Sequence, residues 1–253
     1  MTRSAQRLFD LTGKVALITG GSRGLGREMA LAFAQAGADV VIASRKADAC
    51  ERVAAEVEAL GRKALPHACH VGDWQALDAL ADAAWSHFGK VDILVNNAGM
   101  SPLYPSLAEV SEALWDKVLA VNLKGPFRLT ANLGTRMAAA GGGSIINVSS
   151  IAAIRPTPTE TPYAAAKAGL NALTVAFAHA FGPKVRVNCI MAGPFLTDIA
   201  KAWPPAALAA IESTSALRRA GNPDEIIGAA LYFASDASSF TTGAILRVDG
   251  GRP

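Results

Sequence analysis

Tyr163 and Lys167 are the residues of this chain whose types and spacing most clearly suggest chemistry, and three alanines separate them. On a helix, residues four apart lie on one face, so the two side chains can act on one point. A free tyrosine, with a pKa of about 10, is a poor proton donor or acceptor at neutral pH, and a nearby ammonium favours its phenolate form. The pair therefore predicts a proton-transfer site in which Lys167 lowers the pKa of Tyr163. An ordinary amphipathic helix with a surface lysine would carry the same two residues, so the rest of the chain must decide.

The residues just before Tyr163 predict that the pair does lie on a helix. Thr161 and Pro162 form an N-cap followed by proline at the first helical position. The same arrangement recurs at Asn222-Pro223, where two acidic residues follow in the first turn.

Short apolar runs that favour strands alternate with longer helical patterns along the chain. This alternation predicts an α/β fold: a single-domain, Rossmann-like, doubly wound sheet of seven mainly parallel strands with helices on both faces. The predicted strands are 15–18, 40–43, 64–69, 91–95, 145–148, 185–190 and 245–248, and the helices lie near 24–36, 46–60, 74–88, 111–139, 161–181 and 224–234. Without a linker or repeat, we expect a short mobile leader over 1–9 and one domain over 10–253.

A glycine-rich turn follows the first predicted strand and leads into a helix. It runs Thr19-Gly20-Gly21-Ser22-Arg23-Gly24-Leu25-Gly26. Glycines allow a tight turn and a close approach of the backbone to a pyrophosphate, and the helix N-terminus offers free N–H groups and a positive dipole end. Glycines also serve structural turns, but this position in an alternating chain favours a bound nucleotide.

The spacing of this turn is T-G-x-x-x-G-x-G, and together with the Tyr/Lys pair it resembles the short-chain dehydrogenase/reductase family. The resemblance spans nearly the whole chain. Its further motifs are Asn96-Asn97-Ala98-Gly99, Asn122, Ser150 thirteen residues before Tyr163, Gly193, Thr197 and Val248-Asp249-Gly250-Gly251. It implies an NAD(P)-dependent enzyme that moves a hydride between nicotinamide and a carbonyl or alcohol carbon.

The resemblance also implies roles for four catalytic residues. Tyr163 would be the general acid in reduction and the general base in oxidation. Lys167 would lower the pKa of the tyrosine and hold the nicotinamide ribose. Ser150 rather than the adjacent Ser149 would stabilise the developing alkoxide, and Asn122 would position a water that connects Lys167 to solvent.

The resemblance implies a larger set of cofactor-binding residues, with two departures from the family pattern. His70 stands before Val71 where Asp or Asn is common, and Ala192 replaces the usual proline before Gly193. The expected cofactor contacts are Gly20, Ser22, Arg23, Gly24, Leu25, Gly26, Ser44, Arg45, His70, Val71, Asn97, Ala98, Gly99, Tyr163, Lys167, Gly193, Phe195 and Thr197.

The end of the second strand favours NADP(H) over NAD(H). An acidic residue there would bind the ribose 2′-hydroxyl of NAD and repel a 2′-phosphate. This chain instead has Ser44-Arg45-Lys46, and Arg23 in the glycine-rich turn could face the same phosphate. Alternatively, Arg45 and Lys46 merely begin a solvated helix.

The substrate is less closely defined than the cofactor. Residues 195–217 resemble the family's substrate loop, in which Ile199, Trp203, Pro204 and Pro205 could form an apolar lid. Opposite would lie Met100, Leu103, Ile151, Ile154, Arg155 and the Pro/Thr-rich stretch to Thr161. Arg155 or Glu160 could anchor a polar substrate, or each is a solvated loop charge. A ketone or secondary alcohol of medium size is expected. A 3-oxoacyl thioester, a sugar or a polyol remains open, and a non-catalytic NADP-sensing regulator is a rival of another class.

Composition limits the other functional classes. Of 253 residues, 51% are hydrophobic and 18% charged, and the net charge of +3 comes from dispersed residues, so no nucleic-acid site is expected. Three widely spaced cysteines indicate reduced thiols and a cytoplasmic protein, with no metal site. No apolar run reaches about 18 residues, so no membrane span is expected. By resemblance, helices 111–139 and 161–181 would pair across subunits in a homodimer or homotetramer.

Overall fold

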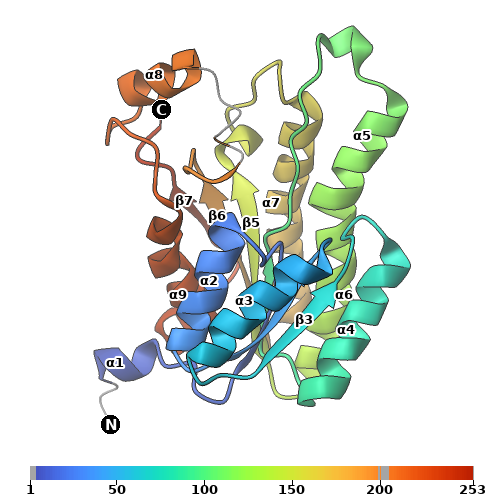
Figure 1. Ribbon diagram of the computed structural model, residues 1–253, viewed down its shortest axis with the longest axis vertical. Coiled ribbons are helices and arrows are strands. Elements are labelled where there is room, and N and C mark those ends of the chain that lie inside the picture. Colours follow the sequence, from blue (N-terminus) through green and yellow to red (C-terminus); the bar gives the residue numbers. More distant parts are fainter. Residues whose placement is uncertain (1–3, 199, 201–204, 253) are drawn as a thin grey trace.

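The computed structural model describes residues 4–198, 200 and 205–252, and these form a parallel sheet between two layers of helices (Figure 1). Seven strands follow the order β3-β2-β1-β4-β5-β6-β7, and every neighbouring pair is parallel. The strands are β1 Val15–Thr19, β2 Asp39–Ser44, β3 Ala64–Ala68, β4 Ile93–Asn96, β5 Gly143–Ser150, β6 Val185–Ala192 and β7 Ile245–Val248. The predicted fold class is confirmed.

Buried side chains alternate between the two faces of the sheet. The helices that flank the sheet are α2 Gly24–Gln35, α3 Ala47–Ala59, α4 Trp74–Phe88, α5 Glu112–Leu119, α6 Gly125–Ala139, α7 Thr161–Phe181 and α9 Ile227–Ala234. In β1, Ala16 and Ile18 join a core with α2, α3 and α9, whereas Val15 and Leu17 join a core with α4, α6 and α7. Because apolar residues cover both faces, the central strands read as continuous apolar runs.

Three local features differ from the sequence-based expectation. The stretch predicted as one helix over 111–139 is interrupted by a π-helical turn, η2, at Ala120–Lys124. Helix α1, Ala5–Leu8, forms within the expected leader, where the Ser4 hydroxyl accepts a hydrogen bond from the backbone of Arg7. Helix α8, Pro205–Thr214, lies in the region expected to be a substrate loop.

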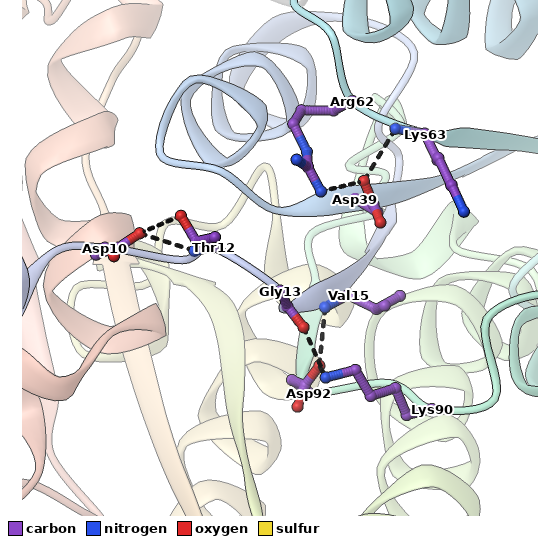
Figure 2. Close-up of polar contacts among 9 residues, drawn as sticks. All are labelled: Asp10, Thr12, Gly13, Val15, Asp39, Arg62, Lys63, Lys90 and Asp92. Atoms are coloured by element: carbon purple, nitrogen blue, oxygen red, sulfur yellow. Dashed lines mark hydrogen bonds and ion pairs between the residues drawn. The ribbon is translucent and has the colours of Figure 1, made fainter.

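Carboxylates organise the amino-terminal edge of the sheet (Figure 2). Asp92 Oδ2 accepts a hydrogen bond of 2.8 Å from the backbone N–H of Val15, and Asp39 Oδ1 accepts one of 2.9 Å from that of Lys63. Lys90 lies 3.0 Å from Asp92 and also donates to a loop carbonyl. These contacts satisfy backbone groups where strands begin, so this edge serves the fold.

Among the described residues, no helix is long and apolar enough to cross a membrane.

Candidate active site

The glycine-rich turn joins β1 to α2 in a geometry that requires glycine. Gly20 and Gly24 have φ angles of 65° and 51°, in the left-handed region. A Cβ atom on Gly26 would lie 2.2 Å from the carbonyl oxygen of Gly20, so a side chain there cannot be accommodated. The turn thus brings the N-terminus of α2, with its free N–H groups, to the carboxyl edge of the sheet. These features fit the pyrophosphate of a dinucleotide.

Thr19 and Asn97 connect this turn to the end of β4. Asn97 Nδ2 donates to the carbonyls of Thr19 and Gly20 at 3.0 and 3.2 Å, and Thr19 Oγ1 accepts from the backbone N–H groups of Asn97 and Ala98. The strand order reverses between β1 and β4, and ligands of open α/β sheets bind at such a point. The expected residues Asn97 and Ala98 therefore support the turn. Thr19, for which the sequence predicted no separate role, bonds through its hydroxyl and its carbonyl to the segment that follows β4.

Ser150, Tyr163 and Lys167 form a second group at the same edge. β5 ends at Ser150, and α7 places Tyr163 within hydrogen-bonding contact of its hydroxyl. Lys167 Nζ lies 5.6 Å from the centre of the Tyr163 ring. Ser149 is buried, and its hydroxyl donates a hydrogen bond of 3.2 Å to the Lys167 carbonyl. Ser150 is therefore the serine whose hydroxyl contacts the tyrosine.

Burial, rather than the neighbouring ammonium, dominates the proton affinities of the pair. It raises the pKa of Tyr163 to about 12, while the bond from Ser150 opposes this rise and the Glu160 carboxylate adds to it. Burial also lowers the pKa of Lys167 to about 8. The prediction that Lys167 lowers the pKa of Tyr163 is therefore wrong for this arrangement. Lys167 is only 3% exposed, and its Nζ donates a hydrogen bond of 2.8 Å to the Val148 carbonyl.

Asn122 lies in the π-helical turn and is fully buried. Its Nδ2 donates to the carbonyls of Met100 and Val118 at 2.8 and 2.9 Å, and its Oδ1 accepts from the Met100 N–H. A Cβ atom on Gly99 would lie 3.0 Å from Asn122 Oδ1 and 3.6 Å from Lys167 Nζ, so the glycine brings these groups together. π-helical turns occur frequently at functional sites.

The segment after β6 faces the glycine-rich turn. The Gly193 N–H donates to the Val248 carbonyl, and a Cβ atom on Gly193 would lie 2.5 Å from Asp249 Cα. The motif 248–251 therefore packs directly on the backbone at Gly193. Phe195 is buried, and the Thr197 side chain lies against Gly24. Between the turn and residues 196–198 and 200 lies a cleft of about 550 Å³, whose lining includes Ser22, Arg23, Thr197 and Asp198.

The residues expected to surround the adenosine ribose lie at or just after the ends of β2 and β3. Ser44 Oγ is 3.2 Å from Cys50 Sγ, and Arg45 is exposed directly after β2. Arg23 is directed instead toward Asp198, with 3.6 Å between charged atoms, which leaves Arg45 as the guanidinium at the end of β2. His70 is exposed, and its Nδ1 accepts from the Gly72 N–H.

The expected substrate-binding residues are only partly placed. Ile199, Trp203 and Pro204 lie outside the described residues, and Pro205 begins α8. Leu103 and Ile154 are exposed at 82% and 47%, while Ile151 is buried. Apolar side chains therefore do lie exposed in the segments that adjoin Gly99 and Ser150.

A dinucleotide turn at the switch point and a Tyr/Lys/Ser/Asn group at the same edge define the class: an oxidoreductase for alcohol and carbonyl groups that uses a nicotinamide cofactor. The sequence model of a family described as enoyl-(acyl carrier protein) reductase matches residues 20–252. The chain is 39% identical over 248 residues to dehydrogenase/reductase SDR family member 4 of Bos taurus, covering 97% of this chain and 89% of that protein. It belongs to the short-chain dehydrogenase/reductase family.

Solved structures show the same relationship. A 7α-hydroxysteroid dehydrogenase complexed with NADH and 7-oxo glycochenodeoxycholic acid superposes with a TM-score of 0.94 at 38% identity, covering 99% of this chain and 98% of that one. An NADPH-dependent 3-quinuclidinone reductase from Rhodotorula rubra gives 0.94 at 32% identity, covering 99% and 95%. The protein is thus an NAD(P)-dependent oxidoreductase that acts on CH–OH groups and carbonyls.

Proposed function

We propose that the protein is an NADP(H)-dependent oxidoreductase that interconverts a ketone and a secondary alcohol, with Tyr163 as the general acid and base. The observation that carries this proposal is the Ser150–Tyr163 contact with buried Lys167 behind it, at the same sheet edge as the glycine-rich turn. The bound nicotinamide would supply or accept the hydride at this edge.

The pKa values assign complementary tasks to the two groups. With its pKa raised to about 12, Tyr163 is protonated at neutral pH and can donate its proton to the alkoxide oxygen that forms during reduction. Ser150 would stabilise the developing charge on that oxygen. Lys167, with its pKa lowered to about 8, can lose and regain a proton near neutral pH and so resupply the tyrosine. Asn122 fixes the Met100 backbone beside it.

The preference for NADP(H) rests on the charge after β2. Arg45 is exposed at the position where an acid would repel a 2′-phosphate, and Ser44 adds a hydroxyl. Similar structures include an NADPH-dependent enzyme and one complexed with NADH, so the proposed preference depends on Arg45 and Ser44.

We also propose a homodimer or homotetramer. Exposed apolar side chains on α5, α6 and α7, including Trp115, Phe127 and Val175, support such an assembly.

The test uses purified protein, NADPH and a carbonyl panel: cyclohexanone, acetophenone, ethyl acetoacetate and fructose. Tyr163→Phe should lower kcat by about a thousandfold because it removes the transferable proton, whereas the Kd for NADPH stays within about twofold. Tyr232→Phe, which loses a hydroxyl bonded to Thr241 instead, should match the wild type. Retained turnover in Tyr163→Phe contradicts the assignment, and tight NADPH binding without turnover of any carbonyl favours a sensor.

The cofactor preference is tested by Arg45→Asp, which should lower kcat/KM for NADPH relative to NADH at least about tenfold, because a charged contact is lost and a repulsion added. Arg52→Asp changes the net charge equally on α3, where Arg52 pairs with Asp48, and should leave the ratio unchanged. If both variants had the same ratio of kcat/KM for NADPH to kcat/KM for NADH, Arg45 would have no role in binding the 2′-phosphate.

A further inference from the structure

Tyr104 joins two segments that are far apart in the sequence and that both border the proposed reaction centre. Its hydroxyl donates to the Pro158 carbonyl at 2.6 Å and accepts from the backbone N–H of Thr161 at 2.8 Å. The side chain is partly buried, and no motif or role described so far includes it.

The bond to Thr161 serves the start of α7. That helix begins at Thr161, and its N-cap residue Glu160 makes no side-chain capping bond, so the predicted N-cap at Thr161 is wrong by one position. The first N–H groups of a helix have no partner within the helix. Tyr104 supplies the missing acceptor from another part of the chain, two residues before Tyr163.

Both joined segments are continuous in the chain with residues of the reaction centre. Residues 151–160 connect Ser150 to the first turn of α7, which carries Tyr163. The segment that contains Tyr104 follows Gly99, which adjoins Lys167 Nζ, and it is held at its start by the bonds between Met100 and Asn122.

Other side-chain bonds in these segments are local. Ser106 donates to Glu109 at 2.7 Å within one segment, and Thr157 donates to Glu160 at 3.1 Å within the other. The two bonds of Tyr104 differ because they cross from one segment to the other and therefore fix their separation.

We propose that Tyr104 is a positioning residue for the reaction: its hydroxyl sets the separation of the two segments beside the substrate and holds the first turn of α7. The inference rests on the proposed function of Tyr163 and Ser150. The two bonds of Tyr104 go to Pro158 and Thr161 rather than to Ser150, Tyr163 or the glycine-rich turn. Its loss should therefore affect carbonyl binding more than chemistry or cofactor binding.

The test is Tyr104→Phe, which keeps the ring and removes both bonds, with Tyr232→Phe as the matched control. KM for the carbonyl reduced fastest by the wild type, among cyclohexanone, acetophenone, ethyl acetoacetate and fructose, should rise about tenfold. In contrast, kcat should fall less than about threefold, and the Kd for NADPH should not change. Amide hydrogen exchange in residues 157–165 should accelerate about tenfold without any ligand, because the Thr161 N–H loses its acceptor.

Two results would overturn the inference. One is a Tyr104→Phe variant whose KM and exchange rates equal those of Tyr232→Phe. The other is a loss of NADPH affinity as large as the change in KM, which would indicate general destabilisation. In either case an inactive Tyr163→Phe variant leaves the proposed function intact, whereas an active one overturns that function and the role of Tyr104 with it.

Discussion

Lys167 is a buried cation, and its burial has a consequence for stability. The residue is 3% exposed, and burial lowers the pKa of its ammonium from 10.5 to about 8. At neutral pH the ammonium is charged in both the folded and unfolded states, so the folded state bears the full unfavourable free energy of that shift, about 3 kcal/mol. The same property allows the lysine to exchange protons near neutral pH. Function and stability therefore oppose one another at this residue.

Lys167→Met should abolish turnover and increase the free energy of unfolding at pH 7 by about 2 kcal/mol, because the buried charge disappears while the bond to the Val148 carbonyl is lost. For a chain of this length, Tm should rise by several degrees. Urea unfolding and calorimetry of both proteins measure the difference.

The pH dependence of this difference separates the charge effect from a general packing effect. Above about pH 8 the folded wild type releases the Lys167 proton, whereas the unfolded chain retains it up to its value of 10.5. Wild-type stability therefore gains from this group as pH rises through that window, and the advantage of Lys167→Met should shrink between pH 7 and 9. An advantage that is constant with pH, or a less stable variant at pH 7, would contradict the assignment.

At the scale of elements, the site depends on how closely α2 approaches the end of β1. A Cβ atom on Gly26 would lie 2.2 Å from the Gly20 carbonyl oxygen and 2.5 Å from Asn97 Nδ2. An alanine there must push α2 away from the turn, and the first N–H groups of the helix move with it. The glycine-rich turn is thus defined by helix packing as much as by backbone conformation.

Gly26→Ala should weaken NADPH binding at least about tenfold and lower the free energy of unfolding by about 1–3 kcal/mol, because the added methyl group overpacks the contact. Gly228→Ala is the matched control: Gly228 lies in α9, and a Cβ atom there would meet nothing within 4 Å. That variant should be more stable by about 0.5–1 kcal/mol with unchanged binding. Titration with NADPH measures the affinity of both variants, and denaturant unfolding measures their free energies of unfolding. Equal behaviour of the two would show that the packing contact is unimportant.

The elements themselves were largely predictable from the sequence. All seven predicted strands are present. The central ones are buried on both faces, and such strands require the continuous apolar runs that predicted them. The π-helical turn at Ala120–Lys124 was not predictable, since one extra residue in a helical turn leaves the apolar pattern nearly unchanged. The start of α7 was misplaced because its capping group comes from Tyr104, 57 positions earlier.

For the whole molecule, topology explains why the site residues meet. β1, β4, β5 and β6 run parallel, so the segments that follow them all emerge at one edge, and the pairing of Ser150 with Ala192 places the end of β5 beside the turn at Gly193. Motif order in the sequence was sufficient to predict this convergence. The direction of the Tyr163 pKa shift was not predictable, because it depends on burial by the assembled fold rather than on the spacing to Lys167.

Assembly is the remaining property of the whole molecule, and exposed apolar side chains on one helical layer make it testable. Val175 on α7 is 40% exposed, and Trp115 on α5 and Phe127 on α6 are 40% and 39% exposed; both helices pack against α7. Water contact with these side chains is unfavourable, and association of two such layers would remove it. A charge at the centre of this surface would be buried without a partner in the assembly.

Val175→Glu should therefore shift the protein from a dimer or tetramer toward a monomer in sedimentation velocity, while the monomer remains folded because the substituted position is exposed. Leu60→Glu makes the same change at a residue that is 42% exposed after α3, on the opposite face of the sheet, and should sediment as the wild type does. A monomeric wild type, or an unchanged Val175→Glu assembly, would exclude this helical layer as the interface. Dissociation by Leu60→Glu instead would place the interface on the α3 side.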